Sequence, residues 1–133
     1  MSRAAVQIAV LGALACGGMK SPGSVADRFV DKYYVESDQE SALPYTSGLA
    51  AMRLRAELKL TEGARAPGLQ LRQVRVYYKR THLDKDGDSR AADYELDIRP
   101  QGGGTLERRA HLELSRERDG TWRVVRFSET QGR

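Results

Sequence analysis

The sequence predicts an α+β fold in which N-terminal helices pack on a curved antiparallel sheet of about four strands. Up to residue 60, apolar residues recur at the three- and four-residue spacing of an amphipathic helix. From residue 74 onward they alternate with charged residues, which is the period of a strand with one buried face. Turn sequences rich in glycine and aspartate separate the alternating runs, which indicates strands joined by hairpins.

The first helix is predicted over residues 24–35. Ser24, with Asp27 three positions later, is similar to a capping box and is therefore expected to be the N-cap. The apolar stripe of this helix is expected to consist of Val25, Phe29, Val30 and Tyr33. Such a stripe requires a packing partner, which the predicted sheet supplies.

A second helical segment is predicted to start near Glu40, to be interrupted around Pro44 and Gly48, and to stop at Gly63. A loop is expected over residues 64–68. The apolar face of this segment is predicted to comprise Leu49, Met52, Ala56 and Leu60, widened by Leu54 and Leu58.

The strands have one apolar and one charged face, so one side of the sheet should cover a core. The residues predicted to face the core are Val74, Val76, Tyr78, Ala92, Tyr94, Leu96, Ile98, Ala110, Leu112 and Leu114, with part of the strand over residues 122–127. Turns are expected at residues 84–88, at residues 100–104 and at Asp119-Gly120. Opposite charges are expected to face one another across the first hairpin: Arg75 and Lys79 against Asp93, Glu95 and Asp97.

The order of these elements resembles the NTF2-like superfamily of cone-shaped α+β domains. The resemblance also rests on the closing strand, which contains Gly120, Trp122, Val124, Val125 and Phe127. It covers residues 24–130 and implies one domain with a pocket between the helices and the concave sheet face. The superfamily includes ketosteroid isomerases, dehydratases, epoxide hydrolases and many non-catalytic binding domains, so the fold alone does not determine function.

Residues 1–15 have the pattern of a signal peptide, because Arg3 precedes an apolar run of about a dozen residues, shorter than the roughly 20 that span a bilayer. Residues 13–15 form a small-residue cleavage site, and Cys16 follows directly, which resembles the lipobox of bacterial lipoproteins. Residues 16–23 are rich in glycine and are expected to form a tether. We therefore expect a lipid-anchored protein of the periplasm or outer membrane. Ordinary cleavage at Ala13–Ala15, which would leave a secreted protein, fits the same residues.

Composition restricts the function further. Cys16 is the only cysteine, so the domain has no internal disulfide and must be stable through core packing. A free thiol or an intermolecular bridge at Cys16 is the alternative to lipid attachment. The 22 basic and 18 acidic residues give a net charge of +4 and are interleaved along the chain. That distribution, together with export, argues against a nucleic-acid partner.

Few residues are candidates for chemistry. The predicted inner face contains no carboxylate, but His82 has the same parity as Tyr78 and could face the mouth of the pocket beside Tyr94. A His at a strand end in water is the alternative, and His111 is expected on the charged face. Neither a metal nor a cofactor is predicted. The aspartates of residues 84–88 fit a hairpin turn better than a calcium loop, and residues 102–104 fit a flexible hairpin loop better than a phosphate-binding loop.

Two hypotheses of function follow. The first, which the sequence favours, is a non-catalytic envelope module that binds a protein partner, itself or an apolar ligand through its sheet face or pocket. The second is a small exported isomerase, dehydratase or hydrolase that acts on an apolar molecule with His82 and one or both of Tyr78 and Tyr94. A polar, partly buried group beside His82 would favour the enzyme. A filled or entirely apolar interior would favour the binding module.

Overall fold

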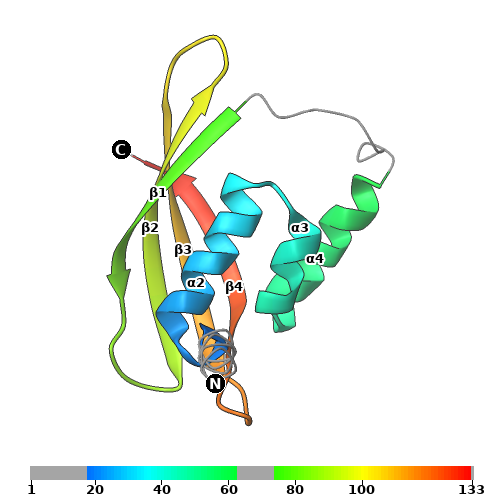
Figure 1. Cartoon of the computed structure of the whole chain (residues 1–133), viewed down its shortest axis with the longest axis vertical. Helices are drawn as coiled ribbons and strands as arrows, with labels where there is room; N and C mark the ends of the chain where they lie inside the picture. The colour runs from blue at the N-terminus through cyan, green and yellow to red at the C-terminus, as the bar shows by residue number, and fades with distance from the viewer. Residues whose placement is uncertain (1–17, 63–73, 133) are drawn as a thin grey trace, which may run out of the picture.

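A computed structural model of the chain describes residues 18–62 and 74–132, and it shows helices packed on one face of a four-stranded antiparallel sheet (Figure 1). The helical elements are η1 (Gly18–Lys20), α2 (Pro22–Val30), its continuation η2 (Asp31–Val35), α3 (Gln39–Ala42), η3 (Leu43–Tyr45) and α4 (Gly48–Leu60). The strands are β1 (Val74–Leu83), β2 (Ser89–Pro100), β3 (Leu106–Arg116) and β4 (Trp122–Gln131), which pair in sequence order. The predicted α+β class is confirmed, and the predicted turns lie between the strands. The predicted signal peptide, Cys16, Gly63 and the loop over residues 64–68 lie outside the described residues.

The first helix begins one turn earlier than predicted. Its N-cap is Ser21, whose hydroxyl oxygen accepts a hydrogen bond from the Ser24 backbone N–H at 3.3 Å, so the prediction of Ser24 as N-cap is wrong. Pro22 explains the difference, because its fixed φ and missing N–H suit the first helical position. The apolar stripe is confirmed, since Val25, Phe29 and Val30 are all fully buried.

α4 packs against β4 with a face that shares only Leu54 with the one predicted. Its buried residues are Ala50, Ala51 and Leu54. Of the predicted face, Leu49, Met52 and Leu60 are 53%, 62% and 84% exposed. α4 is apolar on two sides, and the side with two alanines allows a close approach of the helix to the sheet. No helix in the described part of the chain has the length and apolar character needed to cross a bilayer.

The inner sheet face forms the core with the helices, largely as the alternation predicted. The buried strand residues are Ala92, Tyr94, Leu96, Ala110, Leu112, Leu114, Trp122, Val124 and Phe127. In β4 the register shifts between Val124 and Arg126, so Val125 is an extra residue in the strand. This bulge allows Val124 and Phe127 to be buried on the same face although they are three positions apart.

The first strand departs from the predicted pattern. Val74 and Tyr78 are 40% and 37% exposed, so neither is a core residue. Lys79 lies opposite Glu95 as predicted, but Arg75 lies opposite Arg99 and not opposite an acid. The placement of the helices explains the exposure, because α2 and α4 both pack on β4 and cover the inner face of β1 less.

Candidate functional site

The sequence predicted a cluster of His82, Tyr78 and Tyr94, and the structure separates His82 from the two tyrosines. Tyr78 and Tyr94 are neighbours, with ring centroids 5.9 Å apart in an edge-to-face arrangement. The register of β1 shifts between Arg80 and His82, and this bulge turns His82 to the outer face of the sheet. Its side chain is 54% exposed, and Nε2 lies 2.8 Å from Asp84 Oδ1. The expectation that His82 faces the pocket is therefore wrong, whereas His111 lies exposed on the outer face as expected.

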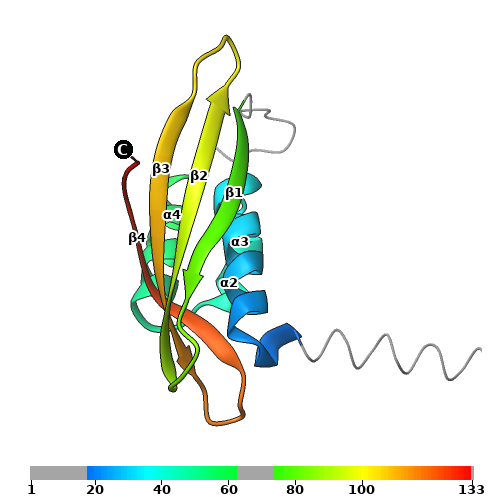
Figure 2. The same cartoon turned by 90° about the vertical axis from the view of Figure 1, so that its left-hand side faces the viewer.

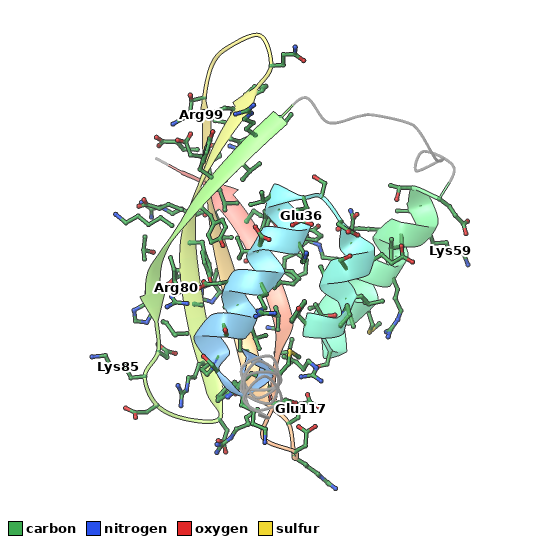
Figure 3. All side chains as sticks on the ribbon, in the orientation of Figure 1. Glu36, Lys59, Arg80, Lys85, Arg99 and Glu117 are labelled. Carbon is green, nitrogen blue, oxygen red and sulfur yellow. The ribbon has the colours of Figure 1, made fainter. Side chains whose placement is uncertain are left out.

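The helices contribute a carboxylate that strand alternation could not reveal. Asp27 of α2 accepts hydrogen bonds from the Tyr94 hydroxyl at 2.5 Å and from Arg80 Nη1 at 3.0 Å. Arg80 Nη1 also donates to the backbone oxygen of Gly23 at 3.1 Å. Figure 3 shows Arg80 between β1 and α2. Arg80 and Tyr94 both donate to Asp27 Oδ1, so this cluster connects helix and sheet.

Burial reinforces this structural role. It raises the pKa of the Tyr94 hydroxyl, and the hydrogen bond to Asp27 raises it further. The pKa of the Tyr78 hydroxyl is also raised, by burial and then by the charges of Asp31 and Asp27. Both phenols are therefore neutral hydrogen-bond donors at physiological pH. Both hydrogen bonds to Asp27 are accepted by Oδ1, so they do not by themselves occupy the second carboxylate oxygen, and the side chain is 42% exposed.

A second polar network at the junction of η2, α4 and β4 was not predicted. Arg53 donates to Glu57 at 3.1 Å, to Glu129 at 3.3 Å and to the backbone oxygen of Phe127 at 3.1 Å. Tyr33 donates to Glu57 at 2.8 Å, and Tyr34 donates to Glu129. Burial, followed by these hydrogen bonds, raises the pKa of both tyrosines. Arg53 and Glu57 are four positions apart on one side of α4, but only the tertiary structure brings them together with Tyr33, Tyr34 and Glu129.

The two largest described hollows open on the outer face of the sheet, which faces the viewer in Figure 2. The first, about 510 Å³, is lined by Tyr77, Tyr78, Lys79, Glu95, Leu96, Asp97, Glu107, Arg108, Arg109 and Gly132. The second, about 410 Å³, is lined by Thr81, Asp93, Tyr94, Glu95, Arg109, Ala110, His111 and Thr130. Most of these residues alternate along their strand with the buried residues, so their side chains lie on the outer face of the sheet. The hollows share Glu95 and Arg109, so they are adjacent, and we call the two together the outer groove.

The strand register determines the charge pattern of the outer groove. Glu95 lies between Lys79 and Arg109, so the middle of the groove is electrostatically balanced. At one end Asp97 lies opposite Glu107, and two adjacent carboxylates repel one another. Asp97 Oδ2 accepts from Arg99 at 2.8 Å, while its buried Oδ1 has no hydrogen-bond partner in the described residues. Because Oδ1 is buried, a bound molecule does not reach it in this conformation. The adjacent carboxylates of Asp97 and Glu107 instead make this end of the groove suitable for a positive charge.

At the other end, His111 Nδ1 lies 2.6 Å from Asp93 Oδ1. The whole groove thus offers charged and hydrogen-bonding side chains, with Tyr77 as its large exposed aromatic residue. No nucleophile is paired with a base there. The arrangement suits recognition of a polar surface such as that of another protein.

The acidic turn and the glycine loop have local roles. Asp84 Oδ2 accepts from the Ala91 backbone N–H at 2.9 Å, and this hydrogen bond, followed by the one from His82, lowers the pKa of Asp84. Asp88 pairs with Arg116 of β3. Within residues 18–62 and 74–132, no three His, Cys, Asp or Glu side chains group in a way that could hold a metal ion. Gly102, Gly103 and Gly104 all have positive φ in the β2–β3 hairpin, the backbone region that favours glycine.

Comparison with known proteins identifies the fold. No protein-family model matches the chain, and no curated protein sequence does so. A solved structure described as a calcium/calmodulin-dependent protein kinase type II association domain, from Thiobacillus denitrificans, has 16% identity and a TM-score of 0.61, with 85% of this chain and 96% of that chain covered. A ketosteroid isomerase-like protein from Erwinia carotovora atroseptica has 10% identity and a TM-score of 0.59, covering 85% and 95%.

A third similar structure is a protein of unknown function with a cystatin-like fold from Nostoc punctiforme. It has 13% identity and a TM-score of 0.57, with 81% of this chain and 86% of that chain covered. Likenesses at this level of identity show the fold alone, and folds of this kind carry many functions. The described part of the chain has the NTF2-like α+β fold.

Proposed function

We propose that this protein is a small exported binding or scaffolding domain, lipid-anchored through Cys16 in the bacterial envelope, that engages a protein partner through the outer face of its sheet. Export and anchoring are inferred from the sequence of residues 1–16. A tether over residues 16–23 would hold the domain near the membrane and raise its effective concentration toward membrane-associated partners.

The location of the outer groove is the observation that supports binding over catalysis. Over β2, β3 and β4 the inner sheet face is covered by one cluster of side chains from helices and strands, while Val74 and Tyr78 of β1 remain partly exposed. The groove lies on the opposite face and is lined by charged residues without a nucleophile–base pair. A filled interior and a polar outer hollow favour recognition of a partner surface over conversion of an apolar substrate.

The experiment is capture of partners by the tagged full chain from detergent-solubilised envelope. The test variant combines Asp97→Lys and Glu107→Lys, which reverses the carboxylates at one end of the outer groove. The matched control combines Glu40→Lys and Glu117→Lys, two exposed residues of α3 and the β3–β4 hairpin that do not line the groove. Both variants change the net charge equally.

We expect a partner that the wild-type chain and the control recover alike and that the groove variant recovers at least about tenfold less. Equal recovery by both variants would contradict binding through the outer groove. Turnover of an apolar substrate by the wild-type chain, abolished by Tyr94→Phe, would instead support the enzyme hypothesis.

Anchoring has its own test. Cys16→Ser removes the proposed acylation site, so the protein should move from the membrane fraction to the soluble fraction while its melting curve is unchanged. Detergent phase partitioning of the mature wild-type and variant proteins measures this. A variant that still enters the detergent phase would refute the lipid anchor.

A further inference from the structure

β1 is an edge strand whose outer margin is open. It pairs with β2 only, and in the described residues no backbone hydrogen bond joins it to another element on its free side. Its first six residues, 74–79, span about 20 Å of extended chain. They contain β-branched and aromatic residues without proline or glycine, and Val74, Tyr77 and Tyr78 are exposed. Such an edge is a template for pairing with another strand.

The outer face of this edge has positive charges without ion-pair partners. Arg75 lies beside Arg99, which is itself bound to Asp97 at 2.8 Å. Lys79 lies opposite Glu95, but neither Lys79 nor Arg75 forms an ion pair with any described residue. Both side chains are exposed. Among the described residues, Glu95 is the only acid directly across the ladder from one of these two cations.

β2 shows which side chains complement β1. Opposite the outward residues Tyr77 and Lys79 it places Asp97 and Glu95, but opposite Arg75 it places Arg99, so Arg75 has no acid across the ladder. Opposite the inward residues Val76 and Tyr78 it places Ile98 and Leu96. A strand added on the free side of β1 would meet the same two faces. Its best match is an extended segment in which acidic residues alternate with apolar ones.

A second copy of this chain, paired in the symmetric register about Tyr77, is a poor match. Two β1 strands paired antiparallel about Tyr77 would place Arg75 directly opposite Lys79 of the other copy, because pairs in such a ladder keep a constant sum of residue numbers. Like charges directly opposite one another destabilise a ladder. The charges therefore favour a different, acidic partner.

We propose that the free edge of β1 binds an extended segment of another protein in which acidic and apolar residues alternate, adding a fifth strand to the sheet. This inference deepens the proposed protein-binding function and rests on it. The added strand would gain backbone hydrogen bonds from residues 74–79, salt bridges with Arg75 and Lys79, and apolar contacts with Val74, Val76 and Tyr78.

The probe is a blocked peptide of alternating glutamate and valine, matched in length to β1, with a peptide of alternating lysine and valine as control. Binding to the full chain in mild detergent is measured by fluorescence anisotropy, and the site is located by hydrogen exchange. The test variant combines Arg75→Glu and Lys79→Glu. Arg123→Glu with Arg126→Glu in β4 is the matched control, since it reverses two charges on the same face at the far margin of the sheet.

We expect the wild-type chain and the β4 variant to bind the glutamate peptide with new amide protection in residues 74–79. The β1 variant should bind it at least about tenfold more weakly and should prefer the lysine peptide. Equal binding by both variants, protection elsewhere in the chain, or an edge already protected without peptide would overturn the proposal. Self-association that the β1 variant abolishes would show a second copy on the edge and would also overturn it.

The two proposals fail in different ways. If an envelope partner is captured through the outer groove while no peptide protects β1, the edge proposal fails and the binding function stands. If the glutamate peptide binds at β1 but no envelope partner is captured, the edge is competent for strand pairing and the proposed function fails.

Discussion

The two margins of the sheet are treated differently by the rest of the molecule. At β4 the backbone oxygen of Val124 accepts from Ser47 N–H at 3.0 Å, and that of Phe127 accepts from Arg53 Nη1 at 3.1 Å. A bridge between Thr46 and Val124 extends this contact. At β1 no comparable backbone contact exists in the described chain. Figure 2 shows the two strands at opposite sides of the sheet.

The residues around the start of α4 therefore cover the backbone of β4 but not that of β1. The β4 margin is closed by the turn before α4 and by a guanidinium whose carbon lies 4.1 Å from the centroid of the Phe127 ring. Sheet margins left open tend to pair with other chains, and proteins generally cover or charge them. Here β4 is covered and β1 is charged.

Truncation of the core residue that begins β4 should have the largest effect. Trp122 is 2% exposed, so Trp122→Ala should cost about 3–5 kcal/mol, a large share of a typical stability of about 5–15 kcal/mol and enough to unfold a domain at its lower end. Tyr77→Ala at the β1 margin should cost about 1 kcal/mol or less, because Tyr77 is 47% exposed. Thermal and urea unfolding measure both. A Trp122 variant with an unchanged melting curve would contradict the assignment of the last strand.

Loss of the cover at the β4 margin should have a smaller effect. Arg53→Ala removes the donor to Phe127 and the partner of Glu57 and Glu129, and we expect a loss of about 1–2 kcal/mol. The expected loss of stability is this small because the Arg53 side chain is 38% exposed and solvent screens its charge. Arg55→Ala, at an exposed position of the same helix, is the control and should change stability by less than about 0.5 kcal/mol. Equal losses in both variants would mean that the network does not hold the margin.

The same network predicts a loss of stability at high pH. The folded state raises the pKa of Tyr33 and Tyr34, through burial first and then through hydrogen bonds to Glu57 and Glu129. Folding therefore favours the neutral phenols, so their contribution is complete below about pH 10 and decreases as the pH rises above it. The urea concentration at the unfolding midpoint should decrease as the pH is raised from about 9 to about 11. Tyr34→Phe should make this decrease smaller. Tyr77→Phe is the control. If the midpoint decreases with pH equally in the Tyr34→Phe variant, the Tyr77→Phe variant and the wild-type protein, the raised pKa of Tyr34 does not contribute to stability.

The smallest effect is expected at the open margin. Arg75→Glu with Lys79→Glu should change the free energy of unfolding by less than about 0.5 kcal/mol, because both side chains are exposed and unpaired in the described structure. Urea unfolding of this variant beside the wild-type protein measures the difference. A loss above about 1 kcal/mol would show that β1 already has a partner in the isolated chain.

Much of the fold could be predicted because it follows from the spacing of apolar residues along each helix and strand. The alternation in β2 and β3 correctly placed Tyr94, Leu96, Leu112 and Leu114 in the core. Prediction failed where a single inserted residue changed parity, as at Thr81 before His82. It also failed for α4, where two apolar faces of one helix could not be ranked from the sequence. The outer groove and the Asp27–Arg80–Tyr94 cluster could not be predicted, because both depend on register and on helix placement.

The sequence alone determined the α+β class, the order of the elements and the turns between them, because each follows from spacing and turn chemistry over a few neighbouring residues. It also supplied the whole case for export and for Cys16. Only the tertiary structure decided that His82 faces water, that a carboxylate of α2 meets Tyr94, and that β4 is covered while β1 is open. The physical reason is that bulges, register and the choice of helix face are set by competition among contacts between distant residues, which local periodicity does not contain.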